Sequence, residues 1–507
     1  MRFQTSILST LFLALTSMVP MLAQADETVT IGDNKFISYG LKGFGYVGAS
    51  AVDKYGDTIS FGSSIALQKN SLSVASDGTY TFTAYGLPDR GYNVDGTNNY
   101  IPRLQVFDIS FKPADSDSSD SGNINWSYKD TILLTDFNGN NMTGLDSNDI
   151  VKMNGFKMPA ATFHGDGWGN DLDSSSTTTA ISLDAEGLAL IEGDIANGFW
   201  ISDEYGPGLY KFNSDGKLVD YIKAPDAILP HVDGKVTYSS GNPPSWDNKD
   251  WEVNDQDSGR DRNKGYEGMD LSSDGKTLYA LLQSATDQEG GEHGYTDGNV
   301  RLMKYDVSSS PATAVAEYVL ELPTYNDPEK DADKNPRVAA QSEMRYIGND
   351  LVLVLPRDDG RGRNADNTES LFRHVDIWDL STADNILGNY DAEGDKIASK
   401  KGNLKSGINV AKHYNFIDVN DSDELAKFNL HNGGDDNPRL LNQKWEGMTL
   451  IPVDGTDAND EYYLLVVSDN DFVTTKGKQN FGKLSFDAGA DIDSQSLIFH
   501  VRIPGLS

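Results

Sequence analysis

Acidic residues recur at fixed places in this sequence, in a pattern that could bind a hard cation. Segments starting at Glu186, Glu267 and Glu446 each open with a Glu-Gly pair and an apolar residue. Each then runs through a polar turn into an apolar strand. A looser copy, SEMRYIGNDLVLVLP, carries Glu343 at its start. The repeat predicts that these glutamates occupy equivalent places in the fold.

The apolar strands of these copies end in polar residues. The ends are Asp203-Glu204, Gln283-Ser284, Arg357-Asp358 and Asp469-Asn470, with Asp89-Arg90 closing a degenerate early copy. If the copies are arranged in a ring, residues at one repeat position lie around one opening. Strand starts and strand ends then surround a single polar site.

Carboxylates gathered in this way favour calcium, which takes six to eight oxygen ligands in irregular geometry. Several carboxylates cannot all ionise side by side unless a cation or arginine offsets their charge. We therefore predict metal ligands at Glu204, Glu267, Glu343, Glu446, Asp469 and Asp89. The predicted catalytic residues are Glu204, Asp203 and Glu267. Bidentate donors suited to phosphate are predicted at Arg90, Arg345 and Arg357.

A structural explanation competes with the functional one. A repeated Glu-Gly pair could bond the backbone of a neighbouring repeat, with glycine required for close approach. Asp89-Arg90 could be a structural ion pair. The adjacent acids Asp203-Glu204 favour function, because two carboxylates at a strand end are costly without a partner. Both explanations of the Glu-Gly pairs remain open at this stage.

Several other chemistries are excluded by what the sequence lacks. It has no cysteine, which removes thiolate nucleophiles and thiolate metal sites. It also has no G-x-S-x-G elbow, no H-E-x-x-H motif and no phosphate-cradling glycine loop. We expect no zinc, haem or nucleotide cofactor.

The surrounding sequence predicts an all-β fold. Short β-rich runs such as TYTFTAYGL, TLYALLQ and EYYLLVVSD alternate with turns rich in Gly, Asn and Asp, whereas helical periodicity is scarce. The repeat favours a single β-propeller of about six blades, with five or seven also possible. Steps of roughly 80 to 100 residues between the glutamates exceed a usual blade and predict long loop insertions.

The start of the chain predicts export. Residues 1–25 have a basic start, an apolar stretch and an A-x-A-like end, which is typical of a signal peptide. Residues 26–507 then form one domain, periplasmic or extracellular, with no membrane span. The formal net charge of −35 repels nucleic acid. Glycosylation sequons occur at Asn125, Asn141 and Asn420.

Longer motifs resemble a known family. The pieces GLPDRGYN, GFWISDEYGPGLYKFNSDGKL, NKGYEGMDLSSDGKTLYALLQS and WEGMTL occur in order over nearly the whole mature chain. They resemble the phytase-like family described as "esterase-like activity of phytase". The resemblance implies a propeller-like fold and hydrolysis of an ester. The sequence departs from the family pattern at Pro356, where an acidic residue commonly precedes the Arg-Asp pair.

Three functions remain after these observations. The first is a secreted, calcium-dependent hydrolase of small phosphate esters. The second is a metal-assisted carboxylesterase or lactonase, and the third is a binding or scaffold propeller without catalysis. The sequence leaves the oligomeric state open.

Overall fold

The computed structural model describes residues 27–93, 96–244, 246, 255–291, 293–456 and 459–506. The signal peptide predicted for residues 1–25 lies outside these residues. The prediction of an all-β chain is confirmed, since the described residues form strands joined by turns, six short 3₁₀ segments and one short helix, α1 (Ser422–Ala426). No helix in the described ranges has the length and apolar character to cross a bilayer.

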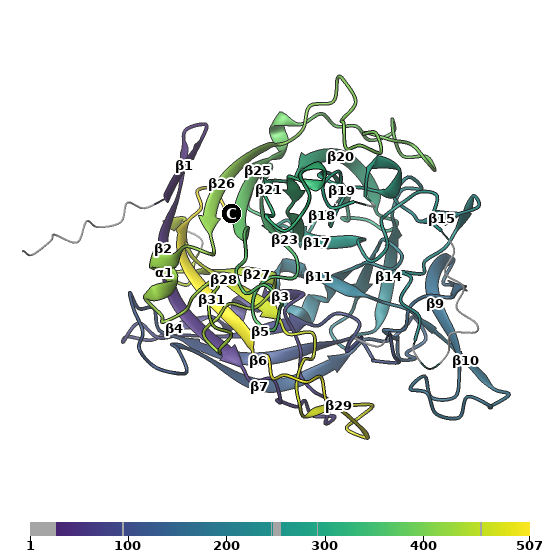
Figure 1. The fold of residues 1–507 in the computed structure, drawn as a ribbon, viewed down its shortest axis with the longest axis horizontal. Coiled ribbons are helices and arrows are strands. Elements are labelled where there is room, and N and C mark those ends of the chain that lie inside the picture. The colour runs from purple at the N-terminus through teal and green to yellow at the C-terminus, as the bar shows by residue number, and fades with distance from the viewer. Residues whose placement is uncertain are drawn as a thin grey trace, which may run out of the picture.

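Five groups of four antiparallel strands make up the body of the molecule (Figure 1). The first is β3 (Ser64–Leu67), β5 (Tyr80–Leu87), β6 (Arg103–Phe111) and β7 (Ile124–Leu133). The second is β11 (Ala185–Leu190), β12 (Phe199–Asp203), β13 (Gly208–Phe212) and β14 (Leu218–Lys223). The third is β17 (Tyr266–Leu271), β18 (Thr277–Leu282), β19 (Asn299–Asp306) and β20 (Thr313–Glu321). The fourth is β23 (Ala340–Tyr346), β24 (Leu351–Arg357), β25 (His374–Asp379) and β26 (Lys412–Asp418).

The fifth group joins the two ends of the chain. It consists of β27 (Lys444–Pro452), β28 (Glu461–Asp469), β31 (Ser494–Arg502) and the N-terminal β2 (Asn34–Val47). A single parallel pairing, Gly45 with Ile124, links β2 to β7 and so connects the fifth group to the first. The pairing of β2 with β31 therefore ties residues near the start of the chain to residues near its end.

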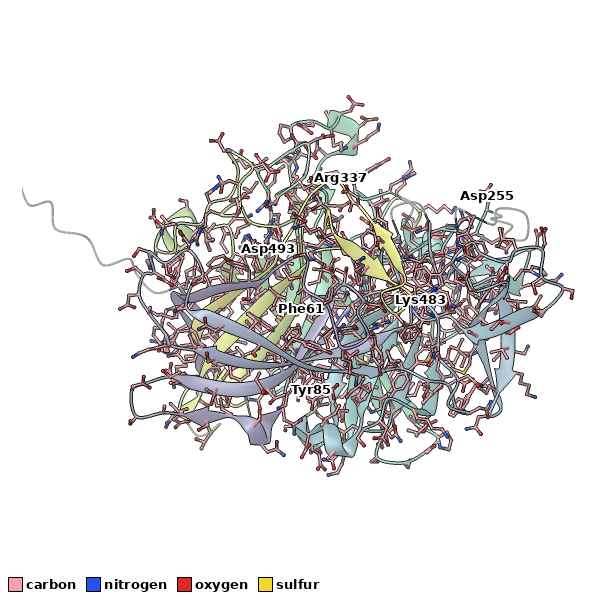
Figure 2. The ribbon with its side chains drawn as sticks, turned by 90° about the horizontal axis from the view of Figure 1, so that it is seen from below. Phe61, Tyr85, Asp255, Arg337, Lys483 and Asp493 are labelled. Carbon is pink, nitrogen blue, oxygen red and sulfur yellow. The ribbon has the colours of Figure 1, made fainter. Side chains whose placement is uncertain are left out.

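Smaller pieces decorate these groups. They are β1 (Glu27–Ile31) beside β2, β4 (Ser73–Val74) beside β5, the sheet β8 (Asp149–Met153), β9 (Phe156–His164) and β10 (Thr177–Ile181), and the pairs β15 (His231–Val232) with β16 (Lys235–Val236), β21 (Thr324–Tyr325) with β22 (Arg337–Val338), and β29 (Gly477–Gln479) with β30 (Leu484–Phe486). Figure 2 shows Asp255, Arg337 and Asp493 on the side of the molecule away from Tyr85.

The first strand of each group lies at the centre of a ring. These inner strands are β3, β11, β17, β23 and β27, and each packs against the next, with β27 returning to β3. Inner strands are buried along nearly their whole length, as in β11, whereas most residues of the outer β7 are partly or fully exposed. This difference is expected, because an inner strand is covered on both faces and an outer strand on one.

Apolar side chains fill the space between each pair of neighbouring groups. For example, Leu104 of the first group packs with Ile201 of the second, and Leu302 of the third packs with Trp378 of the fourth. Equivalent clusters lie between the second and third, fourth and fifth, and fifth and first groups. The described residues therefore form a closed ring in which sheets alternate with apolar cores.

The glycines of the Glu-Gly pairs stand where inner strands approach most closely. A Cβ at Gly187 would lie 2.7 Å from Cβ of Met269, and one at Gly268 would lie 2.9 Å from Cβ of Met344. Real Cβ atoms do not approach so closely, so only glycine fits. Each Glu-Gly pair also coincides with a break in strand register, at Ala185/Leu188 in β11 and at Tyr266/Gly268 in β17. Such a bulge re-aims a side chain, here that of the glutamate.

Arg345 ties the inner strands together. Its guanidinium donates to the carbonyls of Met269 at 2.9 Å, Met448 at 2.7 Å and Ile65 at 2.9 Å. It also forms an ion pair of 2.9 Å with Glu343. These contacts connect β23 to β17, β27 and β3, so the guanidinium, predicted from the sequence to bind substrate, is engaged with four inner strands.

We predict that Arg345→Met lowers the free energy of unfolding by about 3–5 kcal/mol, because it leaves Glu343 buried without its counter-charge. Urea denaturation measures the change. Arg502→Met is the matched control, since the side chain of Arg502 is 39% exposed and lies 3.7 Å from Asp460, and should cost less than about 1 kcal/mol. Equal denaturation midpoints for the two variants would contradict the structural role of Arg345.

Candidate functional site

A cluster of carboxyl groups lies at one end of the inner strands. Asp184 precedes β11, Glu186 lies within it, and Glu204 follows β12. Each offers one oxygen, and these oxygens all lie within 4.8 Å of one another. The carboxyl group of Glu267 in β17 contacts that of Glu204 and so joins the cluster. The structure thus brings together two predicted site residues, Glu204 and Glu267, with two acids from the DAEG segment.

The cluster is almost closed to solvent. Asp184, Glu186, Glu204 and Glu267 are 1%, 6%, 2% and 3% exposed. Oε1 of Glu204 and Oε2 of Glu267 accept no hydrogen bond from any described residue. Buried polar atoms are nearly always partnered in native proteins. Two carboxylate oxygens without a donor in one cluster therefore require an electropositive partner, which is either a proton shared between Glu204 and Glu267 or a bound cation.

Burial raises the pKa of every carboxyl group in the cluster, and repulsion among the groups adds to it. Burial, reinforced by repulsion from Glu267 and Glu204, keeps the pKa of Glu186 well above its usual value. Burial, reinforced by repulsion from Glu267 and Asp184, does the same to the pKa of Glu204. Burial, reinforced by Glu446, raises the pKa of Glu267 to about 8. The cluster therefore retains protons at neutral pH unless a cation replaces them.

Asp203 holds the turn on which Glu204 lies. Its carboxylate accepts the backbone N–H groups of Asp184 at 3.0 Å, Tyr205 at 3.2 Å and Gly206 at 3.0 Å. It also accepts the hydroxyl of Tyr210 at 3.2 Å. Burial raises the pKa of Asp203 to about 8. These bonds fix Asp184 and Glu204 relative to each other, which assigns Asp203 a positioning role in the turn.

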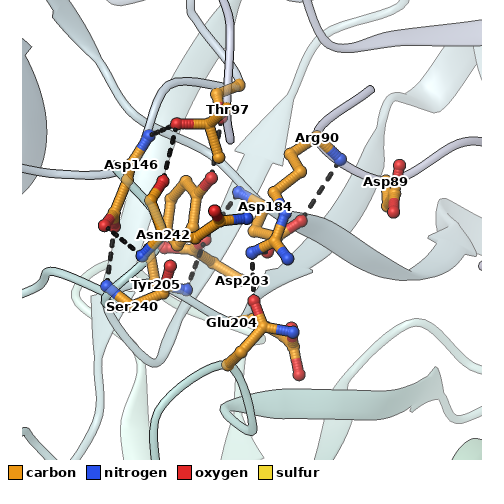
Figure 3. Close-up of polar contacts among 12 residues, drawn as sticks. Asp89, Arg90, Thr97, Asp146, Asp184, Asp203, Glu204, Tyr205, Ser240 and Asn242 are labelled. Carbon is orange, nitrogen blue, oxygen red and sulfur yellow. Dashed lines mark hydrogen bonds and ion pairs between the residues drawn. The ribbon is translucent and has the colours of Figure 1, made fainter. Parts of the chain in front are cut away.

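Two further residues support this turn from outside. Arg260 is fully buried and donates to the carbonyls of Glu204 at 3.0 Å and Tyr205 at 2.8 Å. Asp146 accepts the backbone N–H groups of Ser240 at 2.6 Å and Asn242 at 3.0 Å, which anchors the neighbouring loop (Figure 3). The sequence carries no signal for Arg260, because it lies in a polar loop before β17.

Arg90 lies beside the cluster and is only partly engaged. Its Nη1 forms an ion pair of 2.8 Å with Asp184 and also donates to Oδ1 of Asn263 (Figure 3). Its backbone N–H donates to Asp184 as well, at 3.2 Å. Nε of Arg90, in contrast, has no acceptor among the described residues. Arg90 thus offers one free donor next to the carboxyl groups.

The acids on β27 and beside it, in contrast, have counter-ions. Arg357 forms an ion pair of 2.6 Å with Glu446 and donates to Ser342 at 3.1 Å. Lys444 lies 2.8 Å from Asp471 and 3.6 Å from Glu446. The predicted residues Arg357 and Glu446 therefore meet, but as a pair with each other.

Asp469 and Asp89 complete this set of acids. Asp469 accepts the hydroxyls of Ser60 at 2.8 Å and Ser63 at 3.3 Å, and burial raises its pKa to about 7. Asp89 accepts the backbone N–H of Gly91 at 3.0 Å, and burial keeps its pKa well above the usual value. Both lie near Lys444, which lowers the pKa of each.

Glu343 lies outside the cluster because of strand register. The pairing of β23 with β24 places Ser342 at the position of Glu267 and Glu343 at the position of Gly268. The side chain of Glu343 instead accepts the hydroxyl of Ser64 at 2.5 Å and the guanidinium of Arg345. Strand pairing thus matches Ser342-Glu343-Met344 with Glu267-Gly268-Met269. The sequence analysis had matched Glu343 with Glu267, which is one residue out of register.

Asp184 and Glu186 were absent from the predicted metal ligands. The position of Asp184 in the repeat is occupied by Gly265 and Lys444 in other copies, so the repeat gives it no emphasis. The one local sign of Asp184 is that it adds a further acid to the segment DAEG, two residues before the glutamate of the Glu-Gly pair. The roles predicted for the remaining site residues stay predictions.

The fold and this cluster define a class: a nearly all-β, acidic protein with a buried carboxylate cluster at the centre of a ring of antiparallel sheets. The family model "Esterase-like activity of phytase" (phytase-like) matches residues 72–472. A protein of Arthroderma benhamiae described as "Uncharacterized secreted protein" is 41% identical over 477 residues, covering 91% of this chain and 92% of that protein. The chain belongs to the phytase-like family.

We predict that cation binding to the cluster strengthens as pH rises from about 6 to 9. Carboxyl groups with raised pKa values bind protons below that range, and a cation must displace them. The same raised pKa values mean that the cation-free protein loses stability as pH rises from the unfolded pKa, near 4.5 for Glu267, to its folded pKa of about 8.

Calorimetric titration with Ca²⁺ in two buffers of different ionisation enthalpy measures the protons released. Chemical denaturation with and without Ca²⁺ at pH 5 and pH 8 measures the stability. A Ca²⁺ affinity that does not change across this pH range, with no proton release, would show that the carboxyl groups are already ionised.

Proposed function

We propose that the chain is a secreted hydrolase of small phosphate esters that uses a divalent cation held by Asp184, Glu186, Glu204 and Glu267. The observation that carries this proposal is the pair of buried carboxylate oxygens, one on Glu204 and one on Glu267, that no described residue partners. The family supports ester hydrolysis as the reaction class. Export is supported by the predicted signal peptide and by the description of the Arthroderma benhamiae relative as secreted.

The proposal includes a propeller architecture with five blades. The ring of inner strands and the alternating apolar cores support it. The sequence had favoured about six blades. Five fit the described strands because β2 completes the group of β27, β28 and β31, so the two ends of the chain share one blade.

The donor set suits a hard cation. Carboxylate oxygens are what Ca²⁺ prefers, and its irregular geometry tolerates ligands from three different strands. A bound cation would polarise a phosphoryl or acyl oxygen and activate a water molecule. The protein's part is to hold Glu204 in place through Asp203 and Arg260, and to keep Asp184 in place through Arg90.

A phosphate ester is favoured over a carboxylic ester by Arg90. Its unpartnered Nε is a charged donor beside the cluster, and a phosphoryl group has enough oxygens to meet both a cation and an arginine. Arg357 lies on the opposite side in its pair with Glu446 and is the second anion-binding residue in this proposal. The esterase and the scaffold functions remain the alternatives, and the experiment below separates all three.

We predict that Glu204→Gln weakens Ca²⁺ binding at least tenfold and abolishes hydrolysis, with the denaturation midpoint changed little, because the amide keeps the shape of the side chain but loses its charge. The control is Glu192→Gln, which changes an exposed glutamate just after β11 in the same group of strands and should leave both properties intact. Calorimetry gives the Ca²⁺ affinity.

Hydrolysis of p-nitrophenyl phosphate and p-nitrophenyl acetate is measured side by side. Turnover of phosphate alone supports the proposal, whereas turnover of acetate alone would identify the esterase. Ca²⁺ binding without turnover of either substrate would identify a scaffold. Full activity in Glu204→Gln would remove this residue from the site.

A further inference from the structure

A second cavity lies away from the carboxylate cluster, between β10, the turn after β9 and the β29–β30 hairpin. Its volume is about 490 Å³, within the range of small-molecule sites. Three aromatic side chains line it, Phe163, Trp168 and Phe481, together with the amides of Asn99, Asn141 and Asn480. The residues that line it come from six separate stretches of the chain.

The charged groups of this cavity are already paired. Arg103 forms ion pairs with Asp53 at 2.7 Å and Asp57 at 3.1 Å. Oδ1 of Asp166 accepts the backbone N–H of Trp168 at 2.8 Å, and its Oδ2 accepts Nδ2 of Asn170 at 2.8 Å. The described lining therefore offers neither a free cation to an anionic ligand nor a free carboxylate to a metal ion.

The uncharged groups, in contrast, are available. The side-chain amides of Asn141 and Asn480 make no hydrogen bond within the described ranges, and Asn99 uses only its Nδ2, which donates to the carbonyl of Asp166 at 2.9 Å. An amide offers two donors and an acceptor in one plane. Such groups match the vicinal hydroxyls of a polyol.

Phe481 is held in an unusual way. It is 38% exposed, and its backbone has φ of 58°, a conformation that bulky side chains rarely adopt. The preceding Asn480 has φ of 53°. Strained residues persist where the surroundings impose them, often at ligand sites. This conformation holds the ring in the wall of the cavity, with Tyr55 edge-on at 5.6 Å between ring centroids and Lys483 Nζ 5.8 Å from the ring centroid.

We propose that this cavity binds a neutral saccharide. Aromatic faces cover the apolar faces of a sugar ring, the free amides bond its hydroxyls, and the paired charges give no advantage to an ionic ligand. The saccharide has two sources. It is either a free oligosaccharide or the chain's own glycan, because Asn141 in the cavity wall begins the sequon Asn141-Met142-Thr143.

The test uses the full mature protein made in a host that does not glycosylate. Calorimetry and tryptophan fluorescence follow titration with glucose, N-acetylglucosamine and their β-1,4-linked disaccharides. We expect saturable binding of at least one neutral sugar, weakened at least tenfold in Trp168→Ala and in Phe481→Ala. Tyr46→Ala is the matched control, since Tyr46 is also 38% exposed but lies on β2, and it should bind as the unmodified protein does.

Protein from a glycosylating host separates the two sources. If a glycan on Asn141 fills the cavity, the glycosylated protein loses binding of free sugar and Asn141→Gln restores it. If it still binds, the ligand is a free saccharide. Absence of binding by the unglycosylated protein, equal binding by Phe481→Ala and Tyr46→Ala, or tighter binding of glucose 6-phosphate than of glucose would overturn the proposal. None of these results depends on the carboxylate cluster or on hydrolysis.

Discussion

Repulsion among four buried carboxyl groups is the interaction around which this end of the molecule is built. Oxygens of Asp184, Glu186 and Glu204 lie within 4.8 Å of one another, Glu267 contacts Glu204, and all four side chains are almost out of solvent. Charges in such a place are costly unless they are paired. Fully buried groups hold them there, since Asp203 and Arg260 bond the backbone of the turn and Arg90 bonds the carboxylate of Asp184. One oxygen each on Glu204 and Glu267 is left without a donor among the described residues. An arrangement kept at this cost is better explained by a ligand than by stability.

The close approach of the inner strands makes this cluster possible. Gly187 and Gly268 allow neighbouring strands to meet at distances that no Cβ tolerates. The accompanying bulges turn Glu186 and Glu267 toward the carboxylate cluster. Without the bulges, the two-residue alternation of a strand would place the side chains differently. The structural and functional explanations of the Glu-Gly pair are thus complementary: the glycine allows the packing, and the glutamate uses the position that the packing creates.

The sequence predicted the all-β class, and it placed Glu204 and Glu267 in one group of acids, as the structure does. Strand composition and a repeat are local signals, so both predictions were within reach. The sequence analysis missed features that depend on register and on distant partners. The place of Glu343 depends on strand register, which pairs Met344 as it pairs Met269 and so puts Ser342 in the place of the other glutamates. Asp184 was passed over because the other copies carry Gly265 and Lys444 at its position. The contribution of β2 to the last group is a pairing across the whole chain, which no local pattern contains.

The buried acids in and beside the inner strands fall into two sets, those whose oxygens all have a donor or counter-ion and those with an oxygen that has none. Glu343 and Asp203 have their oxygens engaged by protein donors, and Glu446 is paired with Arg357. These acids are complete within the fold. Glu204 and Glu267 are equally buried, yet each keeps an oxygen without a donor, and Arg90 beside them keeps a donor without an acceptor. A donor and acceptors left open on the same cluster match a ligand that carries both signs of charge, such as a cation with an anionic substrate. A purely structural ion would complete the acids and leave Nε of Arg90 unexplained.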